Sequence, residues 1–143
     1  MTAVVMPRWL GYDWTPWLSL DKAVATGRIP AAQGVYRVRA AGADVLVYIG
    51  ISDSLRKRLR RLRYARDRDD HRGHIAGAGV AAVQGSGPSV EVSWVVMDDV
   101  DRRELVGREV DLIADHRRVT GASPVCQFHG SSVPEPSAPA KRA

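Results

Sequence analysis

The order of hydrophobic and polar positions along the chain predicts a small sheet with helices around it. Residues 34–39 and 45–49 are rich in β-branched and aromatic side chains and flank a short loop around Gly42, which predicts a two-stranded hairpin. The second run is apolar almost throughout, so we expect that strand to be central and covered on both faces. Alternation of valine and tryptophan with other residues predicts a further strand over 90–96.

Helices are predicted between and after these strands. A short capped helix is expected over 19–25, a weak one around 75–83, and a strong one over about 101–118. Ser54 is suited to cap another helix, whose apolar stripe has spacings of four and three residues: Leu55, Leu59 and Leu62. The expected fold class is α/β, with a small three-stranded, largely antiparallel sheet flanked by helices.

A length of 143 residues is sufficient for one domain with an additional segment at one end. We expect an N-terminal extension over 1–33, the domain itself over 34–129, and a disordered Ser/Pro/Ala-rich tail over 130–143. The extension is rich in tryptophan, which leaves two roles open. Its indole rings either stack on nucleic-acid bases or fasten the extension to the domain by burying apolar area: Trp9, Trp14 and Trp17.

Charge is concentrated in one segment. Residues 54–68 hold eight Lys or Arg and a single acid, a net charge of +7 in a chain whose total is +5. Such a face suits a polyanion, and nucleic acid is the usual one. The alternative is a solvated helix face, but the cations are not interleaved with acids as in a helix laced with salt bridges.

Other features of the sequence bear on the cellular location of the protein. Cys126 is the single cysteine, which excludes an internal disulfide and a cysteine-rich metal site and fits a reducing cytosol, so we expect a cytoplasmic protein. No apolar run approaches the roughly 20 residues that cross a bilayer. The first residues lack the pattern of a secretory signal, and no membrane partner is expected.

Two charged residues lie close to apolar helix faces. At 100° per residue, Glu109 falls within the stripe formed by Leu105, Val110 and Leu112, where an ionised carboxylate is costly without a cation or several donors. A structural ion pair with an arginine such as Arg58 and a metal-ligand role are about equally consistent with this position. Arg58 lies on the shoulder of its own helix, placed to reach back over the sheet.

Short motifs surround these two residues. Gly34-Val35-Tyr36 lies on the first strand, Tyr48-Ile49-Gly50 follows on the second, and Arg58 comes eight residues after Gly50. Glu109 opens an E-x-x-L-I pattern, and a P-x-x-Q segment ends at Gln127. In these features the chain resembles the GIY-YIG endonuclease family over roughly residues 34–127. Either tripeptide alone is weak evidence, but both at this spacing, with the arginine and glutamate in register, are strong.

The resemblance implies roles for these residues. Glu109 would hold one Mg²⁺ or Mn²⁺ ion, and Arg58 would stabilise charge on the phosphate. Tyr36 and Tyr48 would align the attacking water, with Tyr36 as the candidate general base if Arg58 and the metal lower its pKa. The remaining cations of the basic helix would bind the DNA backbone: Arg56, Lys57, Arg60, Arg61 and Arg63.

The chain departs from the family pattern at a few positions. Gln127 replaces the asparagine of the P-x-x-N motif, and Ile51 stands where many members have a polar or basic residue. Leu62 stands where some members have a histidine, a role that His71 or His74 in the following segment would fill. A zinc site at this histidine pair is not expected, because no cysteine or acidic partner accompanies it.

Together these features predict a metal-dependent DNA endonuclease with a single active site. Such a site cuts one strand, so a double-strand break would need a homodimer or two binding events. Sequence specificity would be low or be supplied by a partner. The alternative is a nucleic-acid-binding module that keeps the fold but has little or no activity. Ile51 and Gln127 are the features that favour the alternative.

Overall fold

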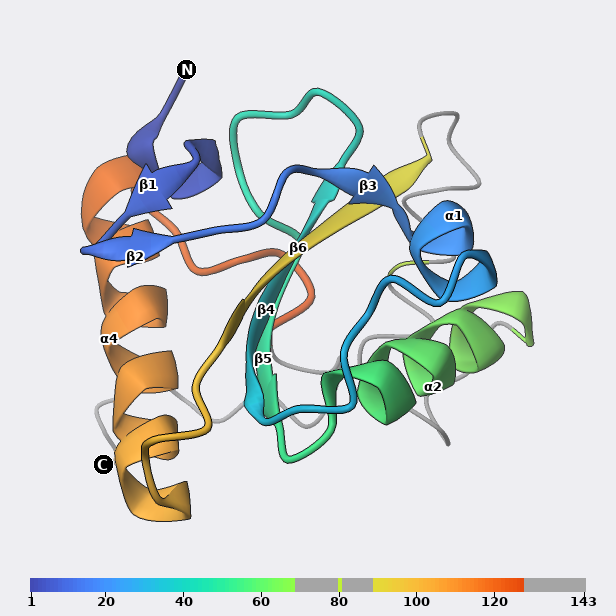
Figure 1. The fold of residues 1–143 in the computed structure, drawn as a ribbon. Coiled ribbons are helices and arrows are strands. Elements are labelled where there is room, and N and C mark those ends of the chain that lie inside the picture. The colour runs from blue at the N-terminus through green and yellow to red at the C-terminus, as the bar shows by residue number, and fades with distance from the viewer. Residues whose placement is uncertain (69–79, 81–88, 128–143) are drawn as a thin grey trace.

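The structure, a computed structural model, describes residues 1–68, 80 and 89–127 (Figure 1). The weak helix expected around 75–83, the two histidines His71 and His74, and the tail expected over 130–143 lie outside these ranges, apart from Val80, which is buried in a helical position. In the described part of the chain, no helix is long and apolar enough to cross a membrane.

A four-stranded antiparallel sheet forms the centre, in the order β3-β6-β4-β5. Its long strands are β4 (Gly34–Ala40) and β6 (Val90–Val96), and β4 lies between β6 and β5 (Tyr48–Ser52). The expected α/β class with a largely antiparallel sheet is confirmed. The sheet has one strand more than expected, because β3 (Leu18–Ser19), from the N-terminal segment, pairs with the outer edge of β6.

The second hairpin strand differs from the prediction in extent and place. It spans Tyr48–Ser52 rather than 45–49, and it is an edge strand rather than a central one. The apolar residues before it are not part of the strand. Val45 is exposed, and the Leu46 amide donates a hydrogen bond to Nε2 of His116 (3.1 Å). The expectation of cover on both faces holds, since Tyr48 and Ile49 are buried in different clusters.

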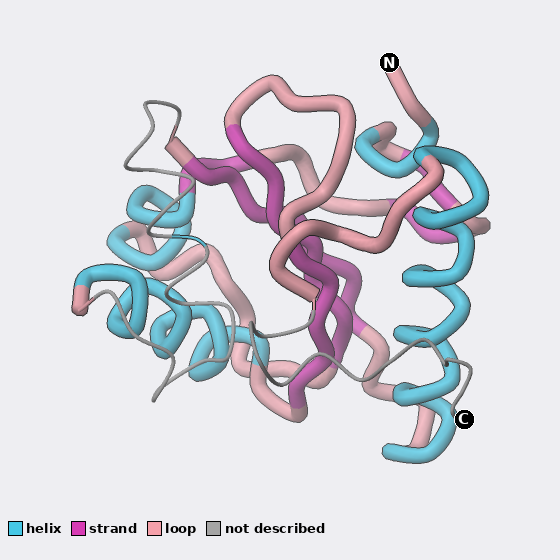
Figure 2. Tube along the Cα trace, turned by 180° about the vertical axis from the view of Figure 1, so that it is seen from behind, coloured by secondary structure: helices cyan, strands magenta, loops and turns pink. Residues whose placement is uncertain are grey.

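Helices cover both faces of the sheet. One buried cluster joins the sheet to α1 (Leu20–Ala25) and α2 (Leu55–Asp67), and the other joins it to α4 (Arg102–Thr120). Seen from behind, the strands run between α4 on one side and the α1–α2 pair on the other (Figure 2). Ser19, Ser54 and Asp101 cap these helices by accepting hydrogen bonds from backbone amides in the first turn, as the Ser54 prediction requires.

The N-terminal segment is fastened to the sheet through tryptophan. It contains a short 3₁₀ turn (Ala3–Val5) and the small hairpin β1 (Arg8–Trp9) and β2 (Tyr12–Asp13). Trp9 and Trp14 are buried in the α4-side cluster, and their indole N–H groups donate to Asp115 and to the Trp9 carbonyl. These rings therefore take the fastening role, because their buried faces do not meet solvent.

An arginine of β4 completes this attachment. Arg37 is fully buried, with its guanidinium 4.4 Å from the Trp14 ring centroid and 4.5 Å from that of Trp17. It donates hydrogen bonds to the carbonyl oxygens of Val4 (2.7 Å) and Met6 (2.9 Å). Burial, and then the charge of Arg39, lower the pKa of Arg37 to about 9, so the side chain stays charged at neutral pH. Cation–π contact and carbonyl dipoles take the place of a carboxylate partner.

Candidate active site

The two tyrosines lie together on one face of the β4–β5 hairpin. In the strand register Tyr36 faces Gly50 and Val38 faces Tyr48, so the tyrosines are diagonal neighbours. Their ring centroids are 6.1 Å apart and the rings are inclined by 37°. On the other side of Tyr36, β6 presents Trp94, which packs in the same buried cluster. The hairpin register therefore brings the two signature tripeptides face to face.

Gly50 makes room for this arrangement. A Cβ atom at this position would lie 2.5 Å from both Cζ and the hydroxyl oxygen of Tyr36, and 2.7 Å from Cε2 of Tyr48. These distances are well inside van der Waals contact, and a buried ring has little space to withdraw. Gly50 lies inside β5, and the tyrosine rings occupy the space that its side chain would take.

Burial distinguishes the two tyrosines. Tyr36 is completely buried, whereas Tyr48 keeps 7% of its surface exposed. Burial, followed by the neighbouring Tyr48, raises the pKa of Tyr36 well above 10, although Arg58 acts in the opposite direction through its charge and a hydrogen bond. Burial also raises the pKa of Tyr48, again against Arg58. Arg58 alone does not bring the pKa of Tyr36 below its ordinary value, because desolvation outweighs one cation.

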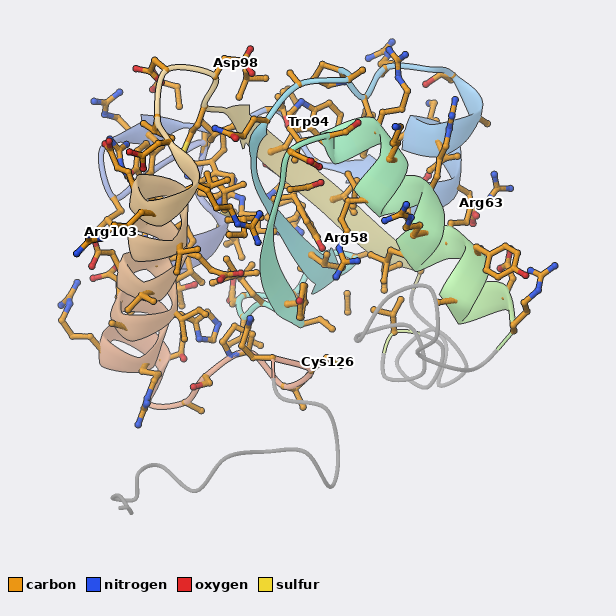
Figure 3. All side chains as sticks on the ribbon, turned by 90° about the horizontal axis from the view of Figure 1, so that it is seen from below. Arg58, Arg63, Trp94, Asp98, Arg103 and Cys126 are labelled. Atoms are coloured by element: carbon orange, nitrogen blue, oxygen red, sulfur yellow. The ribbon has the colours of Figure 1, made fainter. Side chains whose placement is uncertain are left out.

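Arg58 extends from α2 towards the strands. The helix buries its leucine stripe completely, as predicted, and leaves Arg58 half-buried at the edge of that face: Leu55, Leu59 and Leu62. In Figure 3 the Arg58 side chain lies between α2 and the strands of the hairpin. Arg58 acts to lower the pKa of both Tyr36 and Tyr48, so α2 places its charge close to the two signature motifs.

Glu109 comes from α4, on the opposite side of the hairpin. The helix buries Leu105, Leu112 and His116 and leaves Val110 exposed, so Glu109 lies on the shoulder of the buried face rather than in the middle of an apolar stripe. The side chain is half-buried, and burial raises its pKa above 4.5 even though Arg102 and Arg58 act to lower it.

The ion pair considered for Glu109 is absent from the described residues: none of the salt bridges there includes it. A partly desolvated carboxylate with cations near but not in contact is suited to a divalent ion, whose charge would offset the cost of burial. Within the described ranges no three His, Cys, Asp or Glu side chains gather to hold a metal. The residues therefore fit an ion bound through one carboxylate, with water and substrate oxygens as the other ligands.

Gln127 lies beside the signature strand at the open edge of the sheet. Its side-chain oxygen accepts a hydrogen bond from the Ile49 amide (2.8 Å), and its side-chain nitrogen donates to the Ile49 carbonyl (2.8 Å). The Cys126 amide donates to the Val47 carbonyl in the same way (2.8 Å). The side-chain amide thus satisfies the edge of β5 as another strand would, which places Gln127 behind the site as a support for its second motif.

The predicted DNA-binding cations divide into two groups. Arg56 donates from Nε to the Ile29 carbonyl (2.8 Å), and Arg63 forms an ion pair with Asp21 of α1 (3.0 Å). These two arginines have partners within the protein and fasten α2 to the segment before β4, whereas their contact with DNA stays a prediction. The remaining three are exposed and form what we call the α2 basic face: Lys57, Arg60 and Arg61.

Two crystal structures of the GIY-YIG N-terminal endonuclease domain of UvrC from Thermotoga maritima are similar to this structure. The domain bound to its catalytic magnesium matches with a TM-score of 0.50 and 23% identity, over 76% of this chain and 96% of the domain. A tyrosine-to-phenylalanine variant, also bound to its catalytic divalent cation, matches with a TM-score of 0.50 and 22% identity over the same shares. This chain has the GIY-YIG fold.

No protein-family model matches the sequence, and no match was found among curated proteins. The GIY-YIG fold explains why the two tripeptides lie on paired strands with an arginine and a glutamate from separate helices beside them. One residue near the GIY-YIG motifs was missed in the sequence. Arg102 acts on Glu109 more strongly than Arg58 does, and its position seven residues before Glu109, on the same helix face, was the available signal.

Proposed function

We propose that the protein is a divalent-metal-dependent DNA endonuclease that hydrolyses phosphodiester bonds. The observation that carries the proposal is Glu109, a half-buried carboxylate without an ion-pair partner among the described residues, near Arg58 and the two tyrosines. The residue types of this site and the GIY-YIG fold both support it. DNA is the proposed substrate because the α2 basic face borders the site. The single cysteine, Cys126, supports a cytoplasmic location.

Each side chain has a proposed part in the reaction. Glu109 would hold Mg²⁺ or Mn²⁺, which when bound polarises a phosphate oxygen and lowers the pKa of nearby water. Arg58 donates hydrogen bonds to the phosphate as negative charge grows on it. The attacking water would form a bond to phosphorus and lose a proton to solvent, the P–O bond to one neighbouring sugar would break, and the leaving oxygen would take up a proton from solvent.

Tyr48 is the better candidate to contact the attacking water, because Tyr36 has no exposed surface. At neutral pH both hydroxyls are protonated, so Tyr48 accepts a hydrogen bond from the water and orients it. Tyr36 then acts behind it, holding Tyr48 and Arg58 in position. This assignment reverses the roles that the motif alone suggested.

The second candidate function is a nucleic-acid-binding module with little or no activity. The raised pKa of both tyrosines favours it, since neither hydroxyl is a ready base at neutral pH. Cleavage of supercoiled plasmid separates the two. An endonuclease converts it to nicked circles with Mg²⁺ or Mn²⁺ and not with EDTA, and Arg58→Ala abolishes this conversion while DNA binding persists. Binding without nicking in any metal would establish the module instead.

A single active site cuts one strand. Nicked circles should therefore accumulate before linear DNA, unless two copies of the chain act together on one site. The proposed partners are accordingly DNA and, for a double-strand break, a second copy of this chain or a protein that supplies specificity.

A further inference from the structure

Arg102 is the first residue of α4 and lies on the same side of that helix as Glu109. Their separation of seven positions corresponds to nearly two turns, which places the two α-carbons on one face about 10.5 Å apart along the axis. The Arg102 side chain is exposed, and no hydrogen bond or ion pair ties it to another described residue. Its charge is therefore available to a ligand that reaches Glu109.

The other arginines of α4 are differently placed. Arg108 bonds to Glu104 (2.5 Å) and to the Tyr12 hydroxyl (3.2 Å), and Arg118 pairs with Asp115 (2.9 Å). Arg103, the neighbour of Arg102, points away from the hairpin and from Arg58 (Figure 3). A step of 100° between consecutive residues accounts for this difference in direction.

Electrostatics connect Arg102 to the site. Both Arg102 and Arg58 act to lower the pKa of Glu109, and the effect of Arg102 is the larger. The charges of two arginines from different helices therefore both act on Glu109. The single carboxylate of Glu109 cannot neutralise both arginines. The phosphates of a nucleic-acid strand are further anions that the remaining positive charge can bind.

We propose that Arg102 binds a phosphate of the strand being cut, next to or near the scissile one, and thereby fixes which phosphodiester enters the site. One strand of duplex DNA carries a phosphate about every 3.4 Å along the helix axis, so a strand that follows α4 passes Arg102 within about three phosphates of Glu109. Arg102 is a positioning residue in this account, because it acts on the strand and not on the reacting atoms. The inference rests on the proposed function, since it takes the strand cleaved at Glu109 as the ligand.

Binding measured across a range of salt concentrations tests the contact without relying on cleavage. In a Glu109→Gln background, Arg102→Ala should flatten the slope of log K against log salt by about 0.9 on duplex DNA, the loss of one phosphate contact. Arg102→Lys should keep the slope, because an ammonium group also binds a phosphate. Arg103→Ala is the matched control and should leave the slope unchanged, with thermal midpoints confirming that every variant is folded.

Cleavage by the otherwise unaltered protein gives a second readout. On end-labelled DNA, Arg102→Ala should spread the cuts over neighbouring phosphodiesters, and Arg103→Ala should leave the pattern as in the wild type. An unchanged salt slope with Arg102→Ala, or an equal loss with Arg103→Ala, would overturn the proposal. If no variant cuts DNA, the proposed function fails, whereas the salt slope still decides whether Arg102 contacts phosphate.

Discussion

Tyr36 and Gly50 face each other across β4 and β5, and the ring of Tyr36 occupies the volume that a side chain at Gly50 would take. Two residues of different signature motifs thus form one packing unit. The Tyr36 ring fits at this position because Gly50 has no side chain. The position of the ring therefore depends on the register in which β4 and β5 pair.

Replacement of Gly50 by alanine should disrupt this unit. Its Cβ would lie 2.5 Å from the Tyr36 ring, so the ring or the strand must move, and overpacking of this kind costs about 1–3 kcal/mol. The free energy of unfolding in urea measures the loss. Gly107→Ala is the control: an added Cβ there meets nothing within 4 Å, and a helical site gains up to about 1 kcal/mol. Equal effects of the two changes would contradict this account of Gly50.

Removal of a single hydroxyl group from each tyrosine should distinguish the roles of Tyr36 and Tyr48. Tyr48→Phe should lower the nicking rate by about 10²-fold or more, because it removes the group that contacts the attacking water. Tyr36→Phe keeps the buried ring and should have the smaller effect, with both variants still binding DNA. Single-turnover nicking rates at saturating enzyme make the comparison. A larger loss for Tyr36→Phe would return the water-contacting role to Tyr36.

The pH profile provides a separate test of Tyr48. Since its pKa lies above 10, the fraction in the basic form rises about tenfold per pH unit up to that value. Because Tyr48 is proposed to orient the water as a protonated hydroxyl, Tyr48→Phe should lower the rate without changing the shape of the pH profile up to pH 9. A wild-type rate that rises up to pH 9, together with a flat profile for Tyr48→Phe, would assign proton transfer to Tyr48 instead.

The stability of the metal-free protein should depend on Glu109. Its pKa is higher in the folded state than the ordinary value of 4.5, so its contribution to stability is present below pH 4.5 and is lost as pH rises through the folded pKa. In EDTA at pH 7, Glu109→Gln should therefore raise the thermal midpoint, and this advantage should shrink towards pH 4. Asp111→Asn, an exposed change on the same helix, should show no such dependence.

With metal present, the wild type rather than Glu109→Gln should have the higher thermal midpoint. Mg²⁺ should bind the folded wild type and raise its thermal midpoint with increasing concentration, whereas Glu109→Gln should gain little. A metal-dependent shift of equal size in both proteins would place the ion elsewhere.

The sequence predicted the strand pairing and α2 well, because there the burial pattern and the local signals agree. Ser54 caps α2, and the leucine stripe lies in the core as its spacing requires. On α4 the apolar pattern was misleading. Val110 is exposed, whereas the polar His116 is buried, since its ring accepts from the Leu46 amide and donates to the Ala122 carbonyl.

Contacts between distant segments account for the other differences. Residues 45–47 are apolar but precede β5, and there the Leu46 amide donates to His116 of α4 and the Val47 carbonyl accepts from the Cys126 amide. Arg63 forms an ion pair with Asp21, 42 residues earlier, and no local sequence pattern predicts this contact. The metal-ligand role of Glu109 was left open at the sequence level because its alternative, an ion pair with Arg58, depends on the separation of two helices.

The α2 basic face should supply sequence-independent affinity. Replacement of Lys57, Arg60 and Arg61 by alanine should weaken binding to all duplexes alike and reduce the salt slope by about 0.9 for each lost phosphate contact. Arg63→Ala should leave the slope nearly unchanged and act on stability, because its partner is Asp21. Fluorescence anisotropy with unrelated duplexes at several salt concentrations measures both effects. An unaltered slope in the triple variant would move the DNA surface away from α2.

The central claim, that Glu109 is the carboxylate on which hydrolysis depends, is tested most directly by the nicking rate of Glu109→Gln on supercoiled plasmid with Mg²⁺. The matched control is Asp111→Asn, which removes an exposed carboxylate two residues away. We predict that Glu109→Gln binds the plasmid but forms no nicked circles, while Asp111→Asn cuts at the wild-type rate. Nicking by Glu109→Gln at a rate near that of the wild type would contradict the account.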